Sequence, residues 1–381
     1  MMGENAPHTD GARARMRGRV AGVAACALCA GAAHGASETM RSIEGAPSAP
    51  VAPLAVLCGA LARRAVGREL VERALAMGAR TCREDGLRLG IVLCGARLSV
   101  SEIGDTARAA APAVGVTVVS GMAAAPAACA IARRAGLGAS GLTRKTGALL
   151  AAGTSICGVT AIGGLAPAIA ATEREVGVAV ANVVAYGTFG MLTYPYLAKR
   201  LFPEGGTPAG VFLGLSVHDT SQVIGAGMTF RQAFDDEVAF KAATVTKLTR
   251  NLGLAVVIPL LAMAFRDAAT STAGAVGGKK PALVPGFLIA FVGMAALRSL
   301  GDATEAVRDD PRWKMTTKLL GDFSSHVALP CAMAAVGLSL STSSLSGIGA
   351  APFVAGAVAA MTVASVAALS VKALEQSGQL K

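Results

Sequence analysis

Long apolar runs separated by short polar loops fill the chain from residue 20 to residue 372. A transmembrane helix needs about 20 mostly apolar residues, and Gly, Pro and charged residues punctuate the loops between these runs. The pattern predicts an all-α polytopic membrane protein with about 10–11 transmembrane helices. The expected ranges are 20–36, 52–67, 86–100, 109–132, 146–171, 176–198, 209–227, 238–265, 282–300, 317–341 and 349–372.

Polar segments flank the predicted transmembrane domain, 20–372, at both ends. Residues 1–19 form a basic arm, and together with the short run 20–36 they fit either a cleaved targeting segment or a first span. Residues 373–381 form a polar tail. The longest polar stretch, 63–85, predicts a helix at the membrane interface, with a plain surface helix as the alternative.

The Lys and Arg counts of successive loops alternate between high and low along the first half of the chain. Because basic loops stay on the cytoplasmic, stromal or matrix side, this alternation places the N-terminus on that side. The alternation fails at 298–318, where five bases fall on the opposite side. We therefore expect one late segment to be re-entrant or miscounted, and residues 209–227, with four glycines and a His-Asp pair, are the candidate.

Composition supports a lipid environment. The chain of 381 residues is 53% hydrophobic and only 15% charged, with a mean hydropathy of +0.55. Its net charge of +11 is spread over short loops, which argues against nucleic-acid binding. The eight cysteines are scattered in Ala-rich runs, so we expect no metal and no cofactor. The expected location is a plasma membrane or an organelle membrane, as an integral multi-pass protein.

Two glycine- and serine-rich segments, 153–184 and 214–245, resemble each other. Their matched pairs are Gly153 with Gly214, Ser155 with Ser216 and Thr160 with Ser221. A shorter similarity links 97–101 with 337–341. This pair encloses the longer pair along the chain, so the four segments occur in nested order. Internal repeats are typical of transporters built from two pseudo-symmetric halves, so we expect an inverted repeat. Convergence of Gly/Ser/Ala-rich sequence is the alternative.

The same two segments are expected to be discontinuous helices. Backbone can leave the helix at membrane depth only where protein or water satisfies it, and a broken helix presents free N–H groups that attract anions. The alternative is close helix packing through small residues. The expected substrate-binding residues are Gly153, Thr154, Ser155, Gly158, Gly214, Ser216, Ser221, Gln222, Lys247 and Arg250.

One helix face in the next run carries several polar residues. They are Glu237, Lys241, Thr244, Lys247 and Asn251, with Arg250 alongside. Lys247 and Arg250 would lie about 15–20 Å along the helix from Glu237, near mid-bilayer depth. Two bases at that depth need a cavity or a counter-charge. An anion, Asp219 or Glu175 would compensate them, and a purely structural salt bridge is the alternative.

Ionisable side chains beside the breaks are candidates for coupling or gating: His218, Asp219 and Glu175. The alternative is an Asp N-cap with a backbone-bonded His. The neighbours Ser216, His218 and Asp219 cannot form a hydrolase triad, because the base must lie between nucleophile and acid from separate elements. Since no other catalytic motif is present in the sequence, we expect no enzyme.

Five segments, in this order, resemble the YeiH-like family of sulfate exporters: LRLGIVLCGARLSVSEI, AAGTSICGVTAI, LTYPYL, GLSVHDTSQVIGAG and KLTR. The match covers roughly residues 50–372. This family is counted among relatives of the cation/proton antiporters and bile-acid symporters. The resemblance implies inverted repeats with discontinuous helices crossing at the centre. It carries over the positions Gly153–Gly158, Ser216–Gln222 and Lys247–Arg250.

The expected function is a secondary transporter that exports or exchanges a small sulfate-like anion, with proton coupling and a homodimer left open. A cation/proton antiporter with Asp219 and Glu175 as carriers is the first alternative. A non-transporting membrane scaffold is the second.

Overall fold

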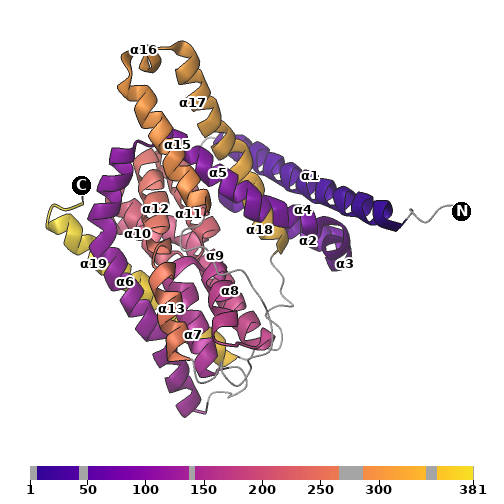
Figure 1. The fold of residues 1–381 in the computed structure, drawn as a ribbon, viewed down its shortest axis with the longest axis vertical. Helices are drawn as coiled ribbons and strands as arrows, with labels where there is room; N and C mark the ends of the chain where they lie inside the picture. The colour runs from indigo at the N-terminus through magenta and orange to yellow at the C-terminus, as the bar shows by residue number, and fades with distance from the viewer. Residues whose placement is uncertain (1–6, 43–49, 137–141, 266–285, 340–349, 381) are drawn as a thin grey trace, which may run out of the picture. The chain divides into compact units, whose positions relative to one another are not determined.

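The computed structural model describes residues 7–42, 50–136, 142–265, 286–339 and 350–380, and every regular element within them is helical (Figure 1). Six helices in these ranges are long and apolar enough to cross a membrane. They are Met16–Met40, Val100–Arg134, Glu173–Leu201, Glu237–Ala264, Pro311–Ser339 and Ala350–Gln376. The chain is thus an all-α polytopic membrane protein, as predicted. Expected residues 282–285, 340–341 and 349 lie outside the described ranges.

The chain divides into two compact units, Met1–Val100 with Ile289–Leu340, and Ser101–Leu288 with Ser341–Lys381. The first unit contains α1 (Pro7–Arg41), α2 (Val51–Val66), α3 (Arg68–Leu70), η1 (Val71–Leu75), α4 (Ala76–Thr81), η2 (Cys82–Gly86), α5 (Leu87–Cys94) and η3 (Gly95–Arg97). Its later part contains α15 (Gly286–Ala303, which begins three residues before the unit), α16 (Glu305–Arg308), α17 (Pro311–Phe323), η5 (Ser324–Ala328) and α18 (Leu329–Ser339).

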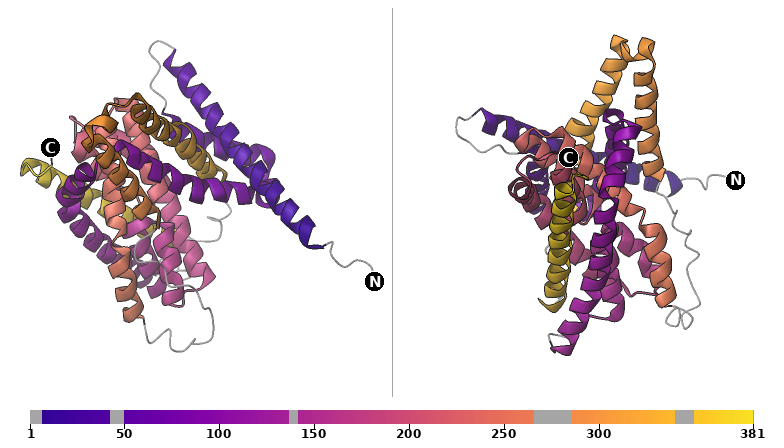
Figure 2. Two further views of the ribbon diagram at one scale, coloured as in Figure 1. Left: turned by 45° about the horizontal axis from the view of Figure 1, so that its top comes forward. Right: turned by 90° about the vertical axis from the view of Figure 1, so that its left-hand side faces the viewer.

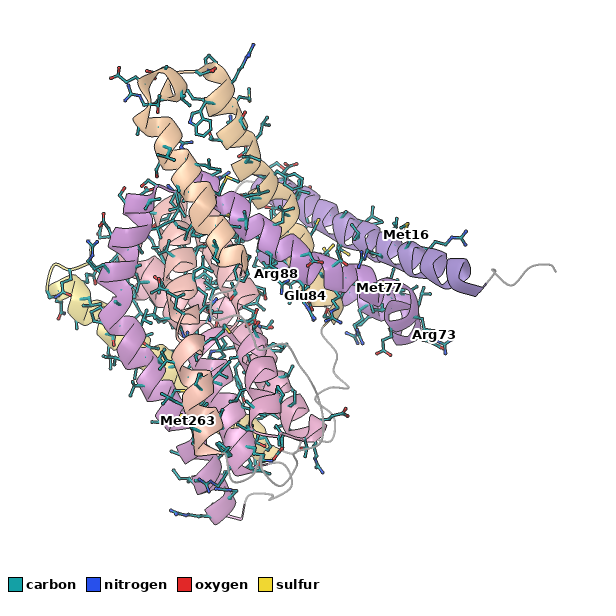
Figure 3. All side chains as sticks on the ribbon, viewed as in Figure 1. Met16, Arg73, Met77, Glu84, Arg88 and Met263 are labelled. Carbon is teal, nitrogen blue, oxygen red and sulfur yellow. The ribbon has the colours of Figure 1, made fainter. Side chains whose placement is uncertain are left out.

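Residues 68–97 form one helical stretch in which α-turns and π-turns alternate up to Cys94 and a 3-10 turn, Gly95–Arg97, follows. Figure 3 labels Arg73, Met77, Glu84 and Arg88 along it. The expected boundary between a polar helix at 63–85 and a span at 86–100 is therefore wrong. Glu84 accepts from Arg80 at 3.0 Å one turn away, and such pairs support a helix through polar sequence.

Small residues join α1 to η1 and α4 in the first unit. A Cβ on Gly22 would lie 2.7 Å from the Cα of Gly78, and one on Gly18 would lie 3.3 Å from the carbonyl oxygen of Ala74. The contacts advance by four residues on both helices, so the two helices run parallel with touching backbones. Small residues at four-residue spacing permit this approach in membrane helices.

The second unit begins with α6 (Val100–Arg134, whose first residue belongs to the first unit) and continues with α7 (Arg144–Ala152), η4 (Gly153–Cys157), α8 (Val159–Ala168) and α9 (Glu173–Leu201). It then contains α10 (Gly206–Ser216), α11 (Thr220–Phe234), α12 (Glu237–Asn251), α13 (Leu254–Ala264) and α19 (Ala350–Gln376). Figure 2 gives two further views of these helices.

The segment predicted as a span at 146–171 is a helical hairpin. Lys145 Nζ donates to the carbonyl oxygen of Ala170 at 2.6 Å, although a straight helix would separate these residues by about 37 Å. Thr143 Oγ1 donates to Glu175 Oε1 at 2.5 Å at the same end. The chain reverses at Gly158, whose φ of +71° favours glycine. We name residues 143–172 the first hairpin.

Residues 205–236 form a second hairpin. The backbone N–H of Gly206, at the start of α10, donates to Asp236 Oδ2 beyond the end of α11, at 2.7 Å. The same residues in a straight helix would be about 45 Å apart. The turn at the tip covers Val217–Asp219, between α10 and α11. The expectation that 209–227 is re-entrant is thus confirmed. Both segments are discontinuous, as predicted, and each second arm turns back beside the first.

Helix α9 connects the bases of the two hairpins. Its 29 residues span about 43 Å, so the hairpins enter the unit from opposite ends (Figure 1). Their tips meet halfway along it: Gln222, in the first turn of α11, donates through Nε2 to the Val184 carbonyl and to Thr188 Oγ1, both at 3.2 Å. A Cβ on Gly153 in the first hairpin would lie 2.8 Å from Val183. Both tips therefore lie at mid-depth.

Candidate functional site

The two hairpin tips touch. A Cβ built on Gly158 would lie 2.6 Å from Asp219 Oδ2 and 2.9 Å from the Cα of Asp219. No side chain fits between the tips at this point, and the positive φ of Gly158 already disfavours one. The site is therefore built where the backbones of two oppositely directed hairpins come into contact.

Helix α12 brings two cations to the tips. It begins beside the base of the second hairpin and reaches Lys247 after ten residues, or about 15 Å, half of a 30 Å hydrocarbon core. The spacing of three residues places Arg250 on the same side of the helix. Lys247 and Arg250 both have an exposed fraction of 0%. Their positive charges must be satisfied inside the protein.

Backbone carbonyls satisfy Lys247. Its Nζ donates to the carbonyl oxygens of Ile156 at 2.9 Å and Val217 at 3.1 Å, and to that of His218. Ile156 lies in the last turn of the first arm of the first hairpin, and Val217 and His218 follow the first arm of the second. The last carbonyls of a helix lack intrahelical partners, and cations are favoured at this end of the helix dipole.

Arg250 binds the same two helix ends, at carbonyls one to three residues earlier in each. Its Nε donates to the carbonyl oxygen of Ser155 at 2.5 Å. Its two terminal nitrogens donate to the carbonyl oxygens of Thr154 and Leu215. The planar guanidinium can reach several acceptors in fixed directions, which suits two converging helix ends. Lys247 and Arg250 together therefore join both hairpins to α12.

The acceptors of these two cations are related by the sequence repeat. Leu215 and Thr154 differ by 215 − 154 = 61, and Val217 and Ile156 differ by 217 − 156 = 61. The touching tip residues keep the same difference, 219 − 158 = 61. The matched pair Ser155 and Ser216 has it too. The sequence similarity between 153–184 and 214–245 thus reflects a structural repeat, a hairpin followed by a helix. The two copies enter the unit from opposite ends.

The amino-terminal ends of the second arms differ from each other. Helix α11 has a side-chain cap, because Asp219 Oδ1 accepts from the N–H of Ser221 at 3.0 Å and from its hydroxyl at 2.6 Å. Helix α8 has Gly158 as its N-cap and therefore no capping side chain. Its first residues, Val159 and Thr160, are exposed. The Ala161 N–H faces the Cys157 thiol, and the N–H groups of Val159 and Thr160 are left for another acceptor.

Buried polar atoms without partners lie near these ends. Asn251, with 4% of its surface exposed, donates through Nδ2 to Thr220 Oγ1 at 3.3 Å at the start of α11. Its Oδ1 has no hydrogen-bond partner among the described residues, and neither has Nδ1 of the buried His218. Such atoms carry a desolvation penalty of about 1–3 kcal/mol each unless a ligand or water fills the position.

The charge at mid-depth is positive. Lys247 and Arg250 contribute two positive charges and Asp219 one negative charge, with His218 counted as neutral. The two carboxyl-terminal and two amino-terminal helix ends carry partial charges of about half a unit each, which cancel. The tips therefore hold a net charge of about +1 in a low-dielectric setting, and this favours an anion.

Several predicted substrate-binding hydroxyls face their own helices. Thr154 Oγ1 donates to the Leu150 carbonyl at 2.8 Å, and Ser216 Oγ to the Phe212 carbonyl at 2.7 Å. Ser155 is buried, with Oγ unpartnered among the described residues. The backbone carbonyls of this tip, rather than its hydroxyls, make the contacts to the cations. Gly153 and Gly214 serve close packing, because a Cβ on Gly214 would lie 2.8 Å from α12.

Glu175 lies at the base of the first hairpin, away from the tips. Its carboxylate accepts from the Thr172 N–H at 2.8 Å and from Thr143 Oγ1 at 2.5 Å, completing a capping box of α9. The roles predicted for Glu175, His218 and Asp219 in coupling stay predictions. Asn251 was predicted on the polar face of this helix but not as a substrate-binding residue. The four-residue spacing of Asn251 from Lys247 was the available signal.

Two discontinuous hairpins joined at mid-depth by buried cations, within an internal inverted repeat, define a polytopic α-helical membrane protein. The chain belongs to the family described as Conserved hypothetical protein 698, whose model matches residues 21–356. The YeiH-like resemblance is confirmed, and the protein is an integral multi-pass membrane protein.

Named relatives support this membership. UPF0324 membrane protein TauZ of Paracoccus pantotrophus is 34% identical over 272 residues, which cover 69% of this chain and 71% of that protein. UPF0324 inner membrane protein YeiH of Salmonella typhi is 32% identical over 271 residues, 70% of this chain and 69% of that protein. No solved structure matches the chain.

Proposed function

We propose that the chain is a secondary transporter for a small sulfate-like anion, and that this anion binds where the hairpin tips meet. The single observation that carries the proposal is the net positive charge at mid-depth: two fully buried cations beside one carboxylate. Transporters with inverted repeats commonly bind substrate at the repeat interface, with half-helix N-termini directed at anionic groups. The uncapped start of α8 provides such an end.

The cations act on the anion through their field. All the hydrogen bonds described for Lys247 and Arg250 go to backbone carbonyls, so direct contacts to substrate are assigned to other groups. The N–H groups of the first turn of α8 and the hydroxyl of Thr160 are the nearest candidates, followed by Thr220 and Asn251 on the second hairpin side. In this arrangement charge and hydrogen bonding are supplied by separate residues.

Flux measurements in proteoliposomes test the proposal. Vesicles containing the purified full chain are expected to take up or release labelled sulfate, or another small anion in competition with it, faster than empty vesicles. Thr160→Val removes the hydroxyl at nearly constant volume and is expected to slow this flux. Thr193→Val is the matched control, because the half-buried Thr193 lies in α9 and its hydroxyl donates to the Phe189 carbonyl of its own helix. Vesicles that move no anion refute the proposal.

A second candidate function is cation/proton antiport, favoured by the half-buried carboxylate of Asp219 at the tip contact. A carboxylate at mid-depth can bind a proton or a small cation in alternation. A pH-sensitive dye inside the same vesicles separates the two functions. Dissipation of a pH gradient by Na⁺ or K⁺, with no response to sulfate, favours antiport. Absence of both responses favours the membrane scaffold.

A further inference from the structure

The two copies of the repeat differ at one equivalent position of their tips. Gly158 and Asp219 are 61 residues apart, and each is the N-cap of its second arm. Asp219 therefore provides a carboxylate to α11 where Gly158 provides no side chain to α8. An N-terminal helix end favours a negative charge. The start of α11 therefore has the carboxylate of its own N-cap residue, and the equivalent start of α8 has none.

The same carboxylate also lies against the uncapped end. Its Oδ1 accepts from the Ser221 N–H and hydroxyl, whereas Oδ2 faces Gly158 so closely that a Cβ there would be 2.6 Å away. Gly158 immediately precedes the first turn of α8. The carboxylate of Asp219 thus serves the electrostatics of both amino-terminal ends at once.

A second observation indicates that a ligand belongs beside it. Asn251 is 4% exposed, holds its amide against Thr220 at the start of α11, and keeps Oδ1 without a partner among the described residues. A half-turn of the amide would let its oxygen accept from the Thr220 hydroxyl and would present its N–H₂ group to a ligand. An anion between the two helix ends would accept that hydrogen bond.

We infer that Asp219 is an internal counter-anion that competes with the transported anion for the amino-terminal end of α8. The inference rests on the proposed function and deepens it. In the substrate-free protein the carboxylate balances the positive field at the tips. An incoming anion must take up a position within a few ångströms of it, and the two like charges repel in a low-dielectric site. The carboxylate therefore weakens anion binding and lets the anion be released.

Asp219→Asn tests the inference, because asparagine keeps the N-cap and the volume but removes the charge. The variant is expected to bind anions more tightly than the wild type. For two unit charges about 5 Å apart at an effective dielectric constant of about 20, repulsion is large enough for a gain of at least about tenfold for a monovalent anion. The gain for divalent sulfate is expected to be about the square of that factor.

A matched control removes the same charge from a different N-cap. Asp236 caps α12 by accepting from the Ala239 N–H at 2.8 Å, and binds Gly206 at the base of the second hairpin. Asp236→Asn is expected to leave anion affinity unchanged. Asp219→Ser, another N-capping residue without charge, keeps the test valid if the asparagine variant misfolds.

The measurement is equilibrium binding of labelled sulfate to the purified full chain, with nitrate as the monovalent competitor. Tighter binding in both Asp219 variants, larger for sulfate than for nitrate, supports the inference, as does binding seen only in the variants. Anion binding by the Asp219 variants that is equal to or weaker than that of the wild type overturns the inference and leaves the proposed function standing. An equal gain for both anions also overturns it. If neither wild type nor variant binds any anion, the proposed function fails together with the inference.

Discussion

Replacing Lys247 by methionine tests whether this residue holds the hairpin tips together. Methionine has a similar length and no N–H group, so Lys247→Met removes three hydrogen bonds with little change of volume. The carbonyls of Ile156, Val217 and His218 lose this donor at a position with no solvent exposure. The same substitution removes the cation from the ends of two helix dipoles.

The magnitude follows from these three acceptors. A buried polar group left without a partner costs about 1–3 kcal/mol, so three carbonyls give about 3–9 kcal/mol. A water molecule can enter the space left by the ammonium group, and the charge no longer has to be desolvated, so the lower part of this range applies. We therefore expect Lys247→Met to lower the free energy of unfolding by about 3–5 kcal/mol.

Thermal unfolding of the purified protein in detergent measures the effect, followed by light scattering or thiol exposure. Lys241→Met is the matched control on the same helix, since Lys241 pairs with Glu102 at 3.7 Å and the partner is half exposed. Exposed pairs of this kind contribute about 0–1 kcal/mol. The expected order of stability is wild type, then Lys241→Met close to it, then Lys247→Met well below.

An equal melting temperature for Lys247→Met and Lys241→Met would refute the reasoning, because it would mean that the three carbonyls do not depend on Lys247. Loss of anion flux with unchanged stability would instead assign Lys247 to anion transport and not to holding the tips together. Lys247→Ala is expected to abolish flux in either case, so the methionine variant is the more informative one.

Three further predictions follow from the backbone contacts. Gly158→Ala forces a side chain onto a residue with φ of +71° and toward Asp219, so we expect a loss of about 1–3 kcal/mol and of anion binding. Gly22→Ala would place a Cβ 2.7 Å from the backbone of α4 and is expected to lower the melting temperature. In a background without the eight native cysteines, we introduce Arg144→Cys and Arg174→Cys singly. Both are expected to react with an impermeant maleimide from the same membrane face.

Each of these has a control within the chain. Gly163→Ala in α8 and Gly31→Ala in α1 meet no atom within 4 Å and are expected to keep or slightly raise stability. Glu204→Cys and Asp235→Cys flank the second hairpin and are expected to label together from the opposite face to the first pair. Labelling of Arg144→Cys and Arg174→Cys from different faces would contradict the first hairpin.

The helical class and most spans could be predicted because they depend on the length and composition of apolar runs. The run at 349–372 corresponds to α19, and that at 109–132 lies inside α6. The first hairpin could not be predicted in this way, since its 143–172 segment is long enough to cross a bilayer once. Only the reversal at Gly158 distinguishes a hairpin from a span, and a positive φ has no unique sequence signature.

The site was predicted in part for a related reason. The three- and four-residue spacing put Lys247, Arg250 and Asn251 on one face at mid-depth, where the structure has them. Their expected partners were an anion or a carboxylate, Asp219 or Glu175. The observed partners are backbone carbonyls, which every residue possesses and which a side-chain pattern cannot reveal. Convergence of two helix ends on one helix becomes visible only in three dimensions.

Arg250 donates to the carbonyl oxygens of Thr154 and Leu215, one in each copy of the repeat. This one side chain makes the two copies mutually dependent. Helix α9, the counterpart of α12, carries no Lys or Arg between Arg174 and Lys199, so the first copy has no cations of its own to hold its tip. Side chains in the two copies can diverge freely, as Gly158 and Asp219 have, but a shift in the main-chain path of either copy disturbs the anchoring of the other. Neither half of the duplication could be excised and remain intact.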